Sequence, residues 1–144
     1  MMNVKEFQQE IVSGMKRWEK IEDAALTSIS KVIEQTDNPF IRLVMEIIQR
    51  DTQMHHRVQE WISLSISEKA AVLTYDDLDK VWRQVEQHME VERQMAAMVR
   101  EMLAAVEGKR MVMQEYLLNF LLEDETKHSN LLHRLEQIKI GLLP

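Results

Sequence analysis

The chain has 144 residues, the common size of one domain, and its 45% hydrophobic and 29% charged residues support one packed core. No apolar run is long enough to cross a membrane, the lack of cysteine excludes disulfides and iron–sulfur clusters, and the N-terminus carries no apolar signal segment, which together favour a cytoplasmic location. The net charge of −6 argues against nucleic acid as a partner.

Turn-forming residues are scarce, with only three glycines and two prolines in the chain. A protein built from strands needs such residues about every 8–12 positions. The many Glu, Gln, Lys, Arg, Ala, Leu and Met residues are good helix formers. We therefore expect an all-α fold that forms one domain over residues 1–144.

Two long helices are expected in the first half of the chain. Asn3 followed by Glu6 is typical of an N-cap and begins a helix over about 3–35. A break at 36–38 leads to a second helix over about 39–65, with Asp37 or Asn38 as the expected cap and Pro39 at its first position. The residues expected to face inward are Val4, Phe7, Ile11, Met15, Trp18, Ala25, Ile29 and Val32 in the first helix, and Phe40, Leu43, Val44, Ile47, Ile48, Val58, Trp61 and Ile62 in the second.

The second half predicts another pair of helices. Thr74, Asp76 or Asp77 is the expected cap of a third helix that runs to about Val106. Gly108 marks a tight reversal before a fourth helix over about 110–139. The inward residues are expected to be Leu78, Val81, Val85, Met89, Met95, Val99, Met102 and Val106, then Tyr116, Leu117, Phe120, Leu121, Leu131, Leu132, Leu135 and Ile138.

The lengths of the links predict the topology. The short links make antiparallel hairpins of helices one and two and of helices three and four. The longer link, 67–75, is apolar in its middle and is expected to pack across the other helices. These features predict an antiparallel four-helix bundle with a longer middle crossover.

The two halves also match one another weakly. A shift of 70 residues aligns the first helix with the third, and a shift of 73 aligns the second with the fourth. A duplicated helical hairpin explains both alignments. The matched pairs include Trp18 with His88, Glu22 with Glu92, Asp51 with Asp124, Thr52 with Glu125, and His55 with His128.

Two carboxylates interrupt the apolar stripes at matching positions. Glu22 lies among inward residues of the first helix, and Glu92 does so in the third. A lone carboxylate in a helical core costs several kcal/mol unless it is paired or bound to a metal. A buried ion pair, a position at a solvated end of the bundle or a metal site would explain both residues.

The other two helices supply further potential metal ligands. Glu125 and His128 form a Glu-x-x-His pair, whose spacing of three places both side chains on one face of a helix. Asp51 and His55 are four apart and also share a face. One acid from each of two helices and an acid–histidine pair from each of the others is how helical bundles build dinuclear carboxylate sites.

In this arrangement the chain resembles the ferritin-like superfamily of rubrerythrins, ferritins and related di-iron carboxylate proteins. The resemblance covers nearly the whole chain, with its clearest motif in the fourth helix and a partial one in the second. It implies an iron site, with manganese or zinc as other possible metals. The implied ligands are terminal carboxylates from Glu22 and Glu92, a bridging carboxylate from Glu125, and imidazoles from His55 and His128.

One position departs from the pattern of that family. Thr52 stands where the second bridging glutamate is expected, and a threonine does not bridge two metals as a carboxylate does. The adjacent Asp51 is either a ligand or a hydrogen-bond partner of an imidazole. A dinuclear, a mononuclear and a vestigial site all remain open.

The remaining histidines give weaker signals. His56 is expected at the surface or at a contact between helices, although it competes with His55 for the inward position, and His133 is expected to face outward. His88 lies one turn before Glu92 and is either a ligand, a base or an ordinary core histidine. Hemerythrin-like proteins hold iron mainly through histidines, but the first helix here contains none.

Two classes of function follow from these patterns. The first is a ferritin-like metal-binding protein whose iron acts on O2 or peroxide as a ferroxidase or peroxidase. The second is a metal-free helical interaction protein with a degenerate site, for which Thr52 is the main argument. In either class we expect a homodimer formed through outward apolar residues such as Trp61 or Trp82.

Overall fold

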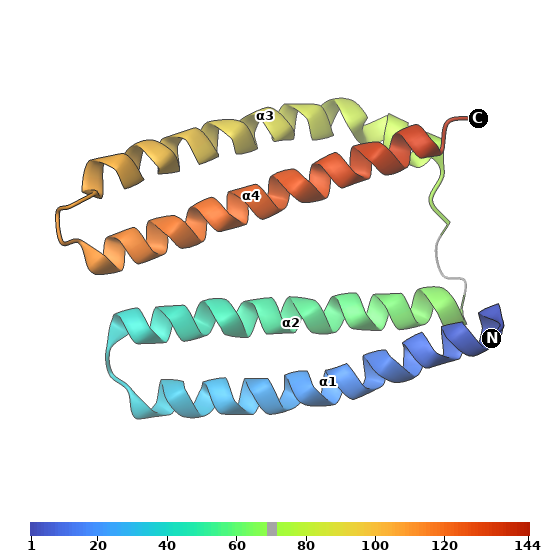
Figure 1. The fold of residues 1–144 in the computed structure, drawn as a ribbon, viewed down its shortest axis with the longest axis horizontal. Coiled ribbons are helices and arrows are strands. Elements are labelled where there is room, and N and C mark those ends of the chain that lie inside the picture. Colours follow the sequence, from blue (N-terminus) through green and yellow to red (C-terminus); the bar gives the residue numbers. More distant parts are fainter. Residues whose placement is uncertain (69–71) are drawn as a thin grey trace. The chain divides into compact units, whose positions relative to one another are not determined.

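The computed structural model describes residues 1–68 and 72–144, and within these ranges the regular structure is α-helical. The four helices are α1 (Val4–Gln35), α2 (Pro39–Ser67), α3 (Tyr75–Val106) and α4 (Val112–Gly141) (Figure 1). The expected all-α class and number of helices are confirmed. None of the described helices is both long enough and apolar enough to span a membrane.

The chain divides into two compact units, Met1–Val72 and Leu73–Pro144. The first contains α1 and α2, which lie side by side in opposite directions and are called hairpin 1 below (Figure 1). The second contains α3 and α4 in the same kind of pair and is called hairpin 2 (Figure 1).

At both ends of α1, side chains form hydrogen bonds with backbone groups that have no partner within the helix. Asn3 accepts a hydrogen bond from the backbone N–H of Glu6, and Glu6 accepts one from the N–H of Asn3, which completes the expected capping box. At the other end, the Arg42 guanidinium donates to the carbonyl oxygens of Ile33 (3.4 Å) and Thr36 (3.2 Å). A residue of α2 thus satisfies the last carbonyls of α1.

The links within the hairpins are fixed by their residue types. Asn38 caps α2 by accepting from the N–H groups of Phe40 and Ile41, and Pro39 occupies the first turn. Gly108 has a φ of 72°, as expected for a glycine that follows the end of a helix. Arg110 also takes a left-handed conformation, with a φ of 55°, which its residue type did not predict.

Thr74 is confirmed as the cap of α3. Its hydroxyl accepts from the N–H of Asp77, and the Asp77 carboxylate accepts from the N–H of Thr74 at 2.9 Å. Hydrogen bonds that the Asp77 carboxylate accepts, first from the backbone and then from the side chain of Thr74, lower the pKa of Asp77. The cap therefore stabilises the ionised carboxylate at the positive end of the helix dipole.

A seam of buried and half-buried residues runs along each hairpin at alternating spacings of three and four, the 3.5-residue period of helices that pack at a small angle. In hairpin 1 the seam is largely polar on α2. In hairpin 2 it is mostly apolar. The seam positions are Met15, Glu19, Glu22, Leu26, Ile29 and Ile33 on α1; Met45, Gln49, Thr52, His56, Gln59, Ser63 and Ile66 on α2; Leu78, Trp82, Val85, Met89, Glu92, Ala96, Val99 and Leu103 on α3; and Leu118, Leu122, Glu125, Ser129, Leu132, Glu136 and Lys139 on α4.

Many apolar residues of the expected stripes lie outside these seams. An apolar arc on a helix is wide, and residue type alone does not say which part of the arc meets the neighbouring helix. Several apolar residues at expected inward positions are therefore exposed on their own hairpins: Val4, Phe7, Trp18, Val32, Leu43, Ile48, Val58, Trp61, Val81, Met102, Tyr116, Leu121, Leu131 and Ile138.

Trp82 corrects one expectation. Its side chain is buried in the seam of hairpin 2, so its expected outward position is wrong, whereas Trp61 is 59% exposed. The expected homodimer stays a prediction. The expected packing of the link 67–75 falls partly on 69–71, which lie outside the described residues; Val72 and Leu73 beside them are exposed.

Lys139 of α4 explains why Trp82 is covered. Its ammonium lies 4.7 Å from the centre of the Tyr75 ring and 5.4 Å from that of Trp82, and it reaches the Tyr75 hydroxyl at 3.4 Å and Asp79 at 3.5 Å. Desolvation acts to lower the pKa of Lys139, but the hydrogen bonds and charge interactions with Tyr75 and Asp79 outweigh it and raise that pKa. The contact joins the ends of α3 and α4.

Removing the cap of α3 is expected to destabilise hairpin 2. Thr74→Ala removes one partner of the capping box and should lower the free energy of unfolding by about 1 kcal/mol. Urea denaturation followed by circular dichroism measures the change. Thr27→Ala, which removes an exposed hydroxyl bonded within α1, is the matched control and should cost less.

The same cap gives a pH dependence. Because the pKa of Asp77 is lower in the folded state, its contribution is present above the ordinary value of 3.8 and is lost as the pH falls through the folded pKa. Asp77→Ala should therefore lower the melting temperature at pH 7 and have a much smaller effect near pH 2. An equal effect at both values would contradict an ionic role for the cap.

Candidate metal centre

The first candidate group lies in hairpin 1. Glu22 of α1 is buried, with 8% of its surface exposed, and its Oε1 lies 3.4 Å from Nδ1 of His55 on α2. The imidazole is more than half exposed. His55 rather than His56 therefore contacts Glu22, although His56 is the half-buried neighbour that lies on the seam of α2.

The other two candidate residues of α2 do not add a carboxylate to this pair. Thr52, one turn before His55, is buried on the seam with 6% of its surface exposed. Asp51 is exposed, and its side chain makes no hydrogen bond or ion pair with any described residue. Its role as a metal ligand stays a prediction.

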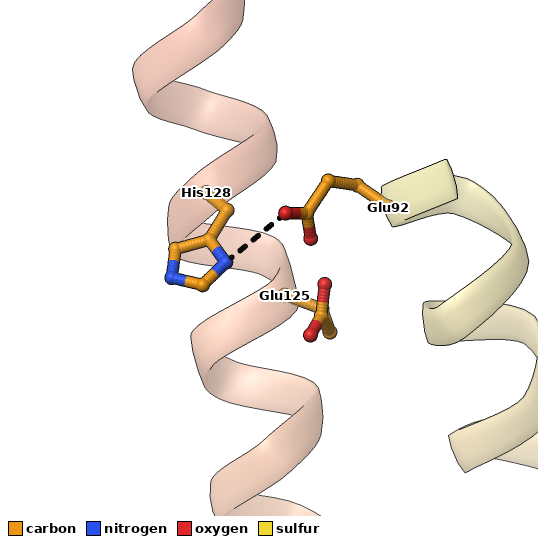
Figure 2. A group of neighbouring side chains, drawn as sticks. All are labelled: Glu92, Glu125 and His128. Atoms are coloured by element: carbon orange, nitrogen blue, oxygen red, sulfur yellow. Dashed lines mark ion pairs between the residues drawn. The ribbon is translucent and has the colours of Figure 1, made fainter. Parts of the chain in front are cut away.

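The second candidate group lies in hairpin 2 and has three members. Glu92 of α3, Glu125 and His128 of α4 each offer one ligand atom, and these atoms all lie within 4.8 Å of one another. Figure 2 shows the carboxylates of Glu92 and Glu125 turned toward one another across the seam, with the His128 ring facing Glu92. The Nδ1 of His128 is 3.3 Å from Oε1 of Glu92, closely matching the His55–Glu22 contact of hairpin 1.

The α-helical spacing explains how these groups form. Glu125 and His128 lie three apart on α4, so both reach toward α3 from neighbouring turns. Glu92 projects from α3 into the same space. Hairpin 1 repeats this arrangement, except that Thr52 stands where hairpin 2 has Glu125.

Two buried oxygen atoms of hairpin 2 have no hydrogen-bond partner in the described chain. These are Oε2 of Glu92 and Oε2 of Glu125. Only 4% of the surface of Glu92 is exposed, so solvent water has little access to its carboxylate and does not replace the missing hydrogen-bond partner. A buried carboxylate oxygen without a partner costs free energy, and a bound cation removes that cost.

The charges in this group also favour a cation. If both are ionised, two carboxylates whose oxygens lie within 4.8 Å of one another repel by about 3 kcal/mol or more at the effective dielectric constant of a protein. Pairing both oxygens with one divalent ion converts this repulsion into attraction. The same groups therefore form an unfavourable cluster alone and a favourable ligand set around a metal.

His88 also touches this group, although the sequence left its role open. Its Nε2 lies 2.8 Å from Oε1 of Glu92, the shortest contact that Glu92 makes with an imidazole. A carboxylate only accepts hydrogen bonds, so the His88 ring donates here. The spacing of four residues on α3 is the signal that placed His88 on the same face as Glu92.

A shallow hollow opens beside these residues. It has a volume of about 280 Å³ and is lined by His88, Glu92, His128, Leu131 and Leu132. A small ligand can therefore reach Glu92 and His128 through this hollow. Two leucines make the wall next to the imidazole apolar.

The six residues predicted from the sequence thus fall into two groups. Glu92, Glu125 and His128 come together, Glu22 and His55 form a pair, and Asp51 stands apart. A site that draws on all six stays a prediction.

No family model, characterised protein or solved structure matches the chain. The resemblance to ferritin-like proteins therefore rests on the residue pattern alone. What the geometry itself supplies is a cluster of two carboxylates and one imidazole that could hold a metal ion in hairpin 2.

Proposed function

We propose that the protein binds one divalent transition-metal ion in hairpin 2, through Glu92, Glu125 and His128, and that the ion is iron. The observation that carries this proposal is the pair of buried carboxylate oxygens, on Glu92 and Glu125, that lack a hydrogen-bond partner in the described chain. Both belong to the group whose ligand atoms lie within 4.8 Å of one another.

The kinds of donor atom support the choice of metal. Carboxylate oxygen and imidazole nitrogen suit Fe2+, Mn2+ and Zn2+, whereas copper(I) prefers sulfur. Two carboxylates neutralise the charge of a divalent ion. Three protein ligands leave coordination positions open to water or a small molecule, as in catalytic rather than structural metal sites.

The resemblance to di-iron carboxylate proteins supports a role in the chemistry of O2 or peroxide. Bound iron would supply the redox chemistry. In this chain, Glu92 and Glu125 would hold the ion, and His128 would provide the third ligand from the next turn of α4. The hollow lined by Leu131 and Leu132 would admit a small reactant.

The comparison of the two hairpins supports one ion per chain. Hairpin 1 offers only Glu22 and His55 at the equivalent position, because Thr52 replaces the third ligand. A site with two protein ligands binds a metal less tightly than one with three. We therefore expect the first equivalent of metal to occupy hairpin 2.

Metal binding should stabilise the folded chain. Under anaerobic conditions, free Fe2+ at 100 times its dissociation constant should raise the free energy of unfolding by about 2.7 kcal/mol. Glu125→Gln should abolish this gain and leave the metal-free protein equally or more stable, because it removes the repulsion between two carboxylates. Thermal melts with and without Fe2+, together with elemental analysis, measure both effects.

Glu123→Gln is the matched control, since Glu123 is an exposed carboxylate two residues from Glu125 on the same helix. It should keep the metal-dependent gain. A wild-type protein that holds no metal and shows no shift would instead support a metal-free helical protein. Consumption of O2 after loading with Fe2+ then tests the redox part of the proposal separately.

Thr52→Glu should create a second site. The new carboxylate would lie on the seam of hairpin 1 beside Glu22 and His55, so the metal content should rise from about one to about two ions per chain. Without metal, the extra buried charge should cost about 3 kcal/mol of stability. Thr52→Gln, which adds similar bulk without charge, should stay at one ion; equal metal contents in the two variants would contradict this role for Thr52.

A further inference from the structure

We infer that His88 is a positioning residue of the metal site, which holds the Glu92 carboxylate in the orientation that binds the ion. This inference rests on the proposed function and adds a residue outside the ligand set of Glu92, Glu125 and His128. Three observations carry it: the hydrogen bond to Glu92, the exclusion of His88 from the ligand cluster, and the difference between the two hairpins.

The hydrogen bond is short and well placed. The Nε2–H of His88 donates to Oε1 of Glu92 at 2.8 Å, from the preceding turn of α3. His128 approaches the same oxygen at 3.3 Å from α4. Oε1 is therefore held by the His88 hydrogen bond, with a His128 nitrogen nearby, while Oε2 remains buried and without a partner in the described chain.

This arrangement fixes a flexible side chain before the metal arrives. A glutamate has three rotatable side-chain bonds, and ordering them on binding reduces affinity. The His88 hydrogen bond restrains the last of these bonds, so that the carboxylate faces Glu125 and His128. Partners of this kind around a metal site are worth about 10–100-fold in affinity.

The location and exposure of the His88 ring favour a positioning role over a role as a metal ligand. Its ring nitrogens fall outside the group of atoms that lie within 4.8 Å of one another. Its side chain is 55% exposed, whereas that of Glu92 is 4% exposed. The ring thus stands at the rim of the hollow and reaches the site through Glu92.

Hairpin 1 provides an internal comparison. Trp18 occupies the position that matches His88, and it is 47% exposed. Glu22 consequently has one imidazole neighbour, His55, where Glu92 has two. The hairpin that carries the third ligand, Glu125, is thus also the one that carries the positioning imidazole.

The test compares four proteins, each as the full chain, with Co2+ alone as the probe. They are the wild type, His88→Ala, His88→Gln and His133→Ala. His133 is an exposed histidine of α4 and provides the matched control for losing an imidazole. Dissociation constants come from competition with a chelator of known affinity, the ligand field from the visible absorption of Co2+, and folding from circular dichroism.

His88→Ala should bind Co2+ about 10–100-fold more weakly than the wild type, with unchanged absorption bands and an unchanged fold. His88→Gln, which keeps an N–H donor, should recover most of the affinity, and His133→Ala should bind like the wild type. Unchanged affinity in His88→Ala would overturn the inference. Altered bands would also overturn it, because they would make His88 a ligand.

Failure of the proposed function gives a different result. If the wild type binds neither Co2+ nor Fe2+, the metal site itself is wrong, and the positioning role is wrong with it. If the wild type binds and His88→Ala binds equally well, only the positioning role is wrong.

Discussion

The buried carboxylate of Glu92 is the constraint on which the rest of hairpin 2 depends. It lies on a seam that is otherwise mostly apolar, with 4% of its surface exposed. A charge in that position destabilises the hairpin unless neighbouring groups compensate for it. His88 and His128 approach one of its oxygens, and the other faces the space shared with Glu125. Imidazoles alone therefore satisfy half of the carboxylate, and a cation would satisfy the remainder together with Glu125.

Hairpin 1 also buries a carboxylate, that of Glu22, but surrounds it with fewer compensating groups. Glu22 is buried on its seam and has a single imidazole neighbour. The seam of α2 continues with Gln59 and Ser63, whose buried polar atoms have no hydrogen-bond partner in the described chain. Buried polar groups that lack a hydrogen-bond partner cost free energy, so they make the pairing of α1 with α2 less favourable. The two hairpins thus share a pattern of residues but differ in what that pattern can hold.

The sequence predicted the fold well wherever local chemistry decides it. The caps at Asn3, Asn38 and Thr74 involve residues within three positions of one another, and the helix ends lie within two residues of those expected. The residues on the seams were predicted less well, because apolar residues cover a wide arc of each helix and the neighbouring helix selects only part of it. Trp82 illustrates the difficulty, since Lys139, 57 positions later, covers its ring. The Arg42 contact with the end of α1 depends in the same way on how the helices pair.

The candidate site was predictable to the extent that helical spacing controls it. Glu125 and His128 share a face because they lie three apart, and His88 and Glu92 do so because they lie four apart. Spacing does not decide whether His55 or His56 meets Glu22, because neighbouring residues point about 100° apart: His56 lies on the seam itself, and the exposed His55 reaches Glu22 from beside it. Glu92 and Glu125 bring two carboxylates together inside hairpin 2, although buried groups of like charge usually lie apart. Folded proteins tolerate such conflicts mainly at functional sites, so this pair, rather than the resemblance to a family, is the stronger argument for metal binding.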